Sequence, residues 1–167
     1  ITVADWFRVL SADGYQCQCD PADGDTVYAE SQWGGLRRLD LHAGSAADIK
    51  PRPDNRDEPA YRFNWSSPIL VSPHNAKTVY FGGDHVFKSV NRGDTWETIS
   101  PDLTRGEPGP NQYAGHTITT LAESPLKAGV LWAGTDDGNL QVSKNGGRDW
   151  TDVSSKIPDV PADRWVA

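Results

Sequence analysis

The chain has 167 residues, of which 37% are apolar and 23% charged, and its formal net charge is −7. These proportions are typical of a globular chain with an ordinary core rather than of a disordered one. The acidic balance, with no basic run longer than Arg37-Arg38, excludes a nucleic-acid interface. The lack of any apolar stretch of about 18 residues excludes a membrane span.

Three segments of the chain repeat with a period of 52 residues. Each repeat is marked by a proline and, seven residues later, by an aromatic ring. The pairs are Pro21 and Tyr28, Pro73 and Tyr80, and Pro125 and Trp132. Because proline fixes φ and cannot donate to a ladder, each proline predicts a turn between two strands.

Each unit predicts four short strands around turns. The first strands span 15–19, 69–71 and 118–121, and the second span 27–29, 79–81 and 131–133. The third span 36–39, 86–90 and 140–142, and the fourth span 48–50, 96–99 and 150–153. Hairpin turns are predicted at Gly34-Gly35, Gly83-Asp84 and Asp137-Gly138. Four short strands in about 52 residues match one propeller blade.

The predicted fold is therefore all-β, a β-propeller segment of about three four-stranded antiparallel blades in an incomplete ring. The blades span 11–60, 61–114 and 115–160. Residues 1–10 are interpreted as the outer strand of a preceding blade, and residues 161–167 as the start of a further one. The missing neighbours are expected to be the remaining blades of a longer protein or a second copy of the chain.

A second motif, S-x-N-x-G-x-x-W, lies between the third and fourth strands of two units, at 89–96 and 143–150. The asparagine oxygen is expected to cap backbone N–H groups, the glycine to supply a positive φ, and the tryptophan to be largely buried between blades. Its structural residues are Ser89, Asn91, Gly93 and Trp96, and then Ser143, Asn145, Gly147 and Trp150.

These motifs resemble the Asp-box, or bacterial neuraminidase repeat, with asparagine in place of the usual aspartate. Phrases such as 27–36, 61–65 and 131–138 resemble large bacterial propellers of the sortilin-like and glycosyl-hydrolase-like kind. The resemblance extends to the ten-bladed sortilin ectodomain, to the twin propellers of xyloglucanases and, more distantly, to sialidases. Since many such proteins are exported, it implies an extracytoplasmic location, although no signal peptide starts this chain.

The candidate ligand-binding residues precede the first strand of each unit, where propellers display such residues around their channel. They are Asp13, Arg62, Asn64, Trp65, Tyr113 and His116. Aromatic faces beside polar groups suit sugars or peptides. The alternative is that Phe63 and Trp65 pack between blades.

No catalytic residue is assigned. Asp13, Asp20 and Glu123 are carboxylates expected near the channel, but no spacing marks two of them as a glycosidase pair. The favoured function is a propeller that binds a protein, peptide or glycan and is non-catalytic in this segment. One alternative is part of a sialidase-like or xyloglucanase-like glycoside hydrolase, and another is an assembly factor of photosynthetic complexes. No cofactor or metal is predicted.

The two cysteines, Cys17 and Cys19, are two residues apart on a predicted strand and therefore point to the same face. This is a poor geometry for a mutual disulfide. We expect buried free thiols, and a site for a soft metal is the alternative.

Overall fold

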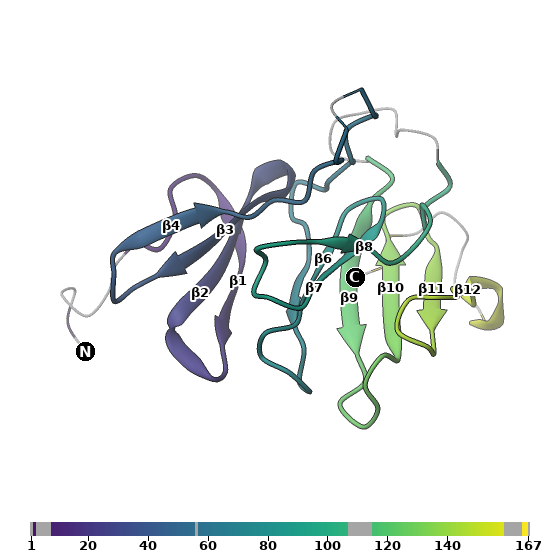
Figure 1. Cartoon of the computed structure of the whole chain (residues 1–167). Helices are drawn as coiled ribbons and strands as arrows, with labels where there is room; N and C mark the ends of the chain where they lie inside the picture. Colours follow the sequence, from purple (N-terminus) through teal and green to yellow (C-terminus); the bar gives the residue numbers. More distant parts are fainter. Residues whose placement is uncertain (1, 3–7, 56, 107–114, 159–164, 167) are drawn as a thin grey trace.

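The computed structural model describes residues 2, 8–55, 57–106, 115–158 and 165–166 (Figure 1). It contains three four-stranded antiparallel sheets, and each sheet follows the order of the chain. The first holds β1 (Gly14–Asp20), β2 (Asp23–Ser31), β3 (Gly35–Asp40) and β4 (Ser45–Asp48). The second holds β5 (Ile69–Val71), β6 (Val79–Gly82), β7 (Val86–Ser89) and β8 (Glu97–Thr98). The third holds β9 (Ile118–Glu123), β10 (Leu131–Thr135), β11 (Leu140–Ser143) and β12 (Thr151–Asp152).

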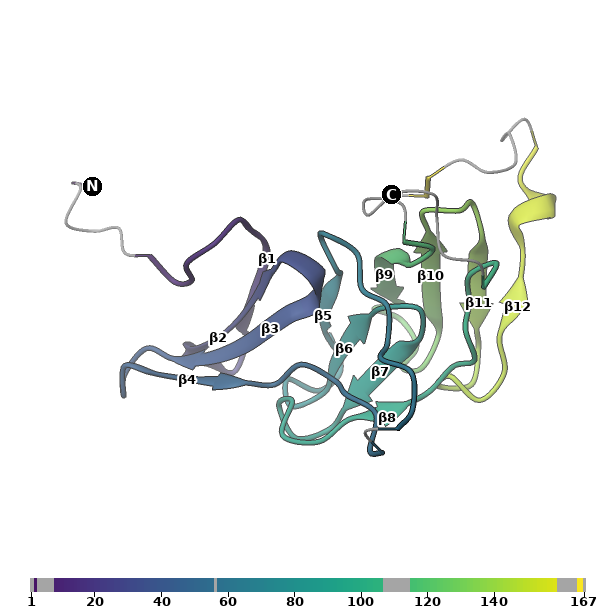
Figure 2. The same ribbon diagram turned by 90° about the horizontal axis from the view of Figure 1, so that it is seen from above.

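The all-β prediction of three four-stranded antiparallel sheets is confirmed. The described helical segments are two 3-10 turns, η2 (Gln32–Gly34) and η3 (Ser154–Lys156). Neither of these short turns is long enough to cross a membrane. The first strands β1, β5 and β9 lie near one another, and the sheets diverge from them toward the outermost strands β4, β8 and β12 (Figure 2). Strand β5 contacts both β1 and β9.

The central strand β6 of the middle sheet is covered on both faces, one by the first sheet and the other by the third. Successive side chains of a strand point in opposite directions, so neighbouring residues of β6 enter different clusters. Phe81 of β6 faces the first sheet, where it joins a cluster with Tyr28 and Leu36. Tyr80, the residue before it, joins a second cluster with Ile118 and Leu131 of the third sheet. Two apolar seams therefore hold three sheets together, and all four residues of β6 are buried.

The S-x-N-x-G-x-x-W turns of the second and third sheets each form a hydrogen bond to the residue that directly follows the outer strand of the preceding sheet. In the second sheet, the Asn91 side-chain oxygen accepts a hydrogen bond from Thr95 N (3.0 Å) and Ser89 Oγ accepts one from Gly93 N (2.8 Å). The Trp96 indole N–H then donates to the carbonyl of Ile49 (2.6 Å).

The third sheet repeats the arrangement. Asn145 accepts a hydrogen bond from Asp149 N (3.0 Å), and the Trp150 indole donates to the carbonyl of Ile99 (3.0 Å). Trp96 and Trp150 are partly buried and pack against the two core clusters, and neither ring is exposed. Each indole lies at the open margin of a seam, where it satisfies a carbonyl of the neighbouring sheet and leaves part of its ring in solvent.

The predicted flanking segments lie mostly outside the described residues. Residues 8–10 form no strand, which does not fit the expected outer strand at 1–10. At the other end, Val166 N donates to the carbonyl of Thr135 (3.0 Å), as Ile118 N does to the carbonyl of Gly83 (2.7 Å) in the sheet before. Assignment of 161–167 to a further blade stays a prediction.

The cysteines are free, as expected, but both are exposed rather than buried. Gln16 faces the second sheet, where its side-chain oxygen accepts a hydrogen bond from Ile69 N (3.0 Å). Alternation along β1 then directs Cys17 and Cys19 to the opposite face of the first sheet. That face lies away from both apolar seams, which explains the exposure.

Packing at the S-x-N-x-G-x-x-W turn of the third sheet predicts that alanine substitution of two adjacent glycines lowers stability by very different amounts. Gly146 and Gly147 both have positive φ (78° and 97°). A Cβ on Gly147 would lie 2.7 Å from the carbonyl oxygen of Ile99, whereas a Cβ on Gly146 would meet nothing within 4 Å. We expect Gly146→Ala to cost about 1–2 kcal/mol from backbone strain alone, and Gly147→Ala to cost at least about 1 kcal/mol more. Urea unfolding of the two variants measures the difference, and equal losses would contradict the close approach.

Candidate ligand-binding site

The segments that precede β1, β5 and β9 form one continuous rim. The Gln32 amide donates to the carboxylate of Asp13 (2.9 Å), which ties the start of β1 to the η2 turn. Trp33 of that turn packs edge to face on Trp65, with ring centroids 5.1 Å apart. The Asn64 amide in turn donates to Thr117 Oγ1 (2.9 Å), just before β9. All three sheets therefore contribute to the same rim.

The main aromatic feature of this rim is the aromatic pair, defined as Trp33 and Trp65. Trp33 is 37% exposed and has φ 63°, ψ 36°, a left-handed conformation that bulky residues rarely adopt. Lys50 Nζ donates to the Trp33 carbonyl (2.7 Å) and holds the turn in place. Strain of this kind persists only where surrounding contacts fix it, and it concentrates at binding sites.

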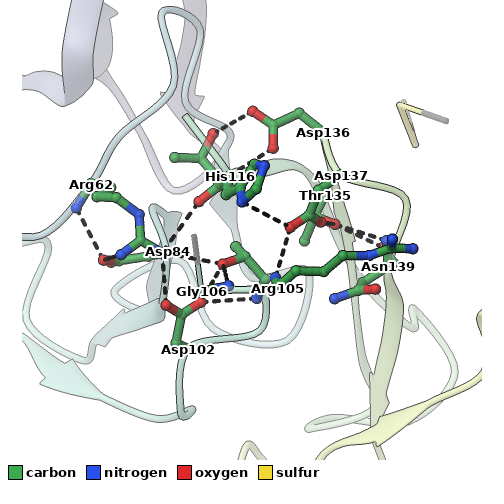
Figure 3. A network of polar contacts seen from close by, with 12 residues as sticks. Arg62, Asp84, Asp102, Arg105, Gly106, His116, Thr135, Asp136, Asp137 and Asn139 are labelled. Atoms are coloured by element: carbon green, nitrogen blue, oxygen red, sulfur yellow. Dashed lines mark hydrogen bonds and ion pairs between the residues drawn. The ribbon is translucent and has the colours of Figure 1, made fainter. Parts of the chain in front are cut away.

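Arg62 is the centre of a network of ion pairs between the second and third sheets (Figure 3). Its guanidinium lies 2.7 Å from Asp102 and 3.4 Å from Asp84. It also donates to Thr104 Oγ1 (3.1 Å). Burial alone raises the pKa of Asp102, but hydrogen bonds from Thr104 and Arg62 outweigh it and hold that pKa below its usual value. The guanidinium is thus committed to carboxylates of its own chain.

His116 and two aspartates extend the network over the third sheet (Figure 3). His116 has φ 49°, and its Nδ1 lies 3.8 Å from the carboxylate of Asp137. That carboxylate also accepts a hydrogen bond from Arg105 N (2.7 Å). Asp136 accepts one from Thr117 N (2.8 Å), and burial raises its pKa. These aspartates mainly cap backbone N–H groups where the sheets join.

The structure places the described candidate residues on the rim but gives them different roles. Asn64 is 2% exposed, because its amide bridges Thr117 and Asp136 of the third sheet, so it has no surface for a ligand. Arg62 is committed to the network, whereas Asp13 and Trp65 flank the exposed Trp33. Tyr113 lies outside the described residues.

Phe63 packs between the sheets, as the alternative interpretation expected. It is buried and its ring stacks on Phe81 at 5.4 Å between centroids. Trp33 was not among the candidate residues predicted from the sequence. The available signal was a large aromatic residue directly before Gly34-Gly35, where the turn geometry favours residues without a side chain.

Of the carboxylates considered for catalysis, Asp13 is far from Asp20, and Asp20 and Glu123 each bond a side chain of this chain. Asp13 and Asp20 flank the two ends of β1, and a strand of that length separates them by roughly 20 Å. Asp20 is buried against Arg92 (2.8 Å), and Glu123 accepts a hydrogen bond from Ser72 (2.6 Å) at the far end of β9. A glycosidase pair needs a separation of at most about 9.5 Å. Within the described residues, no group of three or more His, Cys, Asp or Glu side chains is placed to hold a metal ion.

Comparison with known proteins supports a propeller. No family model matches the chain. The oligoxyloglucan-reducing end-specific xyloglucanase of Emericella nidulans is 24% identical over 156 residues, which cover 87% of this chain and 18% of that enzyme. The chain therefore spans less than a fifth of the relative that it matches.

Solved structures give the same fold. An ancestral GH74 enzyme and the GH74 enzyme of Niastella koreensis each superpose with a TM-score of 0.56 at 18% identity, over 84% of this chain and 18% of theirs. YCF48 from Cyanidioschyzon merolae superposes with a TM-score of 0.53 at 18% identity, over 86% of this chain and 38% of its own. The three sheets are thus blades of a partial β-propeller, and at this identity the likeness is one of fold.

The Arg62 network predicts a large loss of stability when its central cation is removed. Arg62→Leu removes the arginine counter-charge of Asp84, whose side chain is 6% exposed, and leaves His85 as its remaining ion-pair partner. We expect a loss of about 2–4 kcal/mol in the free energy of unfolding. Arg52→Leu is the control, because its ion pair with Asp48 is exposed and is expected to contribute less than about 1 kcal/mol. Equal losses in urea unfolding would contradict the structural role of Arg62.

Proposed function

We propose that this chain is part of a β-propeller that binds a glycan at the rim formed before β1, β5 and β9, and that this segment is non-catalytic. The observation that carries the proposal is the aromatic pair. An exposed indole, fixed in a strained backbone conformation and flanked by polar groups, is a suitable platform for the apolar face of a sugar ring.

Polar groups next to the aromatic pair support this assignment. Asp13 and Gln32 form an exposed hydrogen-bonded couple directly beside Trp33. Lys50 holds the turn by bonding the Trp33 carbonyl, and its ammonium lies 4.5 Å from the ring centroid of Phe63. Hydroxyl-rich ligands need such donors and acceptors around an aromatic face. The weak similarity to a xyloglucanase favours a glycan over a peptide or protein.

A glycoside hydrolase is the second candidate, supported by the same similarity to the xyloglucanase. Because Asp20 and Glu123 are bonded to Arg92 and Ser72 of this chain, its catalytic carboxylates would lie at least partly outside this chain. An assembly factor of photosynthetic complexes is the third, and it would need an arginine patch. Arg62 and Arg92 instead each face a buried carboxylate of the same chain.

The S-x-N-x-G-x-x-W turns fit the proposal as Asp-boxes in which asparagine replaces aspartate. Asn91 and Asn145 cap the N–H groups of Thr95 and Asp149 in the same way in both copies. Their role is structural, because each clips one blade to the preceding one through its tryptophan. Membership of the sortilin-like group, with the extracytoplasmic location that it implies, rests on the sequence resemblance.

The proposal predicts that Trp33→Ala weakens glycan binding selectively. We expect a fall of about 5- to 10-fold in affinity for xyloglucan oligosaccharides, since one stacked aromatic contact contributes about 1 kcal/mol. Calorimetric titration measures it.

Trp132→Ala is the matched control for this titration. Trp132 is exposed to a similar degree (40%) but lies on β10, away from the rim. An equal loss in both variants would place the binding surface elsewhere. An absence of binding by the unmodified chain to any oligosaccharide tested would overturn the glycan assignment.

A further inference from the structure

Glu30 breaks the repeat at the joint between the first and second blades. In the strand ladders Glu30 pairs with Leu36, Gly82 with Val86, and Gly134 with Leu140. Glu30, Gly82 and Gly134 are therefore equivalent, 52 residues apart. A Cβ on Gly82 would lie 2.7 Å from Pro68, so this glycine permits close approach of the chain that enters β5.

The first blade fills the equivalent space with a carboxyl group. Glu30 is 0% exposed, and its Oε1 accepts a hydrogen bond from Ser67 N (3.2 Å). Glu30 lies near the end of β2, three residues before Trp33, in the strand that leads directly into the Trp33 turn. Its Oε2 is buried and has no hydrogen-bond partner.

The carboxyl group therefore connects the two segments that carry the aromatic pair. Glu30 belongs to the strand that leads into the Trp33 turn, and its hydrogen-bond donor Ser67 lies two residues after Trp65. We propose that Glu30 is the positioning residue of the aromatic pair, because its single carboxyl group fixes the strand that leads into the Trp33 turn of the first blade to the Trp65 turn of the second. Only the ligand-binding consequence of this inference rests on the proposed function.

The charge of this carboxyl group makes the joint sensitive to pH. Burial raises the pKa of Glu30 to about 8, against the lowering effect of the hydrogen bond from Ser67. Asp13 and Lys50 contact the η2 turn, and Tyr28 and Arg38 share the face of the first blade with Glu30. Residues 63–69 and β5 contain no titratable side chain.

The sign of the pH effect follows from the raised pKa. Unfolded Glu30 has an ordinary pKa near about 4.3, so its contribution to stability is complete below that pH. Stability then declines as the pH rises toward about 8, because the unfolded chain has lost a proton that the folded chain keeps. Above about 8 the folded chain carries a buried carboxylate, which gains hydration only if the joint opens.

The test follows the circular-dichroism signal of the coupled tryptophans between about pH 6 and about pH 9.5 in the unmodified chain and in Glu30→Gln. Trp33→Phe identifies the part of the signal that comes from the aromatic pair. We expect the unmodified chain to lose this part with a midpoint near about pH 8, whereas Glu30→Gln keeps it throughout, because the amide oxygen accepts the same hydrogen bond without titrating. A Cys17→Ser, Cys19→Ser variant is the control for thiols that titrate in this range.

Either of two results of the pH titration would overturn the inference: the same transition in Glu30→Gln, or loss of the transition in the cysteine variant. Glu30→Ala should lack the signal at every pH, and a full signal in a folded Glu30→Ala chain would also contradict it. Glycan titration of the same proteins separates the two proposals. If the unmodified chain shows the transition but binds no glycan, Glu30 positions the pair and the proposed function fails.

Discussion

Each blade of this protein has an apolar face that only the next blade can cover, and the rest of the structure depends on that pairing. The equivalent rings Tyr28 and Tyr80 are 0% and 3% exposed, because the second and third blades lie over them. Trp132, at the same position in the third blade, is 40% exposed. The difference arises from the neighbour and not from the ring, since all three occupy the same place in a central strand. Stability is thus shared between blades, as in other repeat proteins.

The period of 52 residues was sufficient to predict the three sheets, because prolines end strands and glycines mark hairpins whatever surrounds them. Burial was harder to predict. The thiols of Cys17 and Cys19 were expected to be buried and are exposed. Strand periodicity tells which residues share a face, but it does not tell which face a neighbouring sheet covers.

The candidate site was predicted in position but only partly in composition. Residues before the first strand of each blade do meet at one rim, as the repeat implied. However, Asn64 is committed to a contact with the third blade and Arg62 to carboxylates of its own blade, because the entering chain must satisfy its polar groups where the sheets join. Trp33 was missed because the Gly34-Gly35 signal was interpreted only as a hairpin turn, and the left-handed conformation of the residue before it was not considered.

Departures from a repeat are informative because the blade geometry alone does not require them. The first joint holds two such departures: Trp33 adopts a conformation suited to glycine, and Glu30 stands where the later blades have glycine. Each is unfavourable by itself, one through backbone strain and the other through burial of a carboxyl group. Glu30 lies in the strand that leads into the Trp33 turn, and its carboxyl group accepts a hydrogen bond from Ser67 in the turn that carries Trp65, so both departures act on the same pair of indoles. The unusual features of the first blade are therefore concentrated at its joint with the second blade.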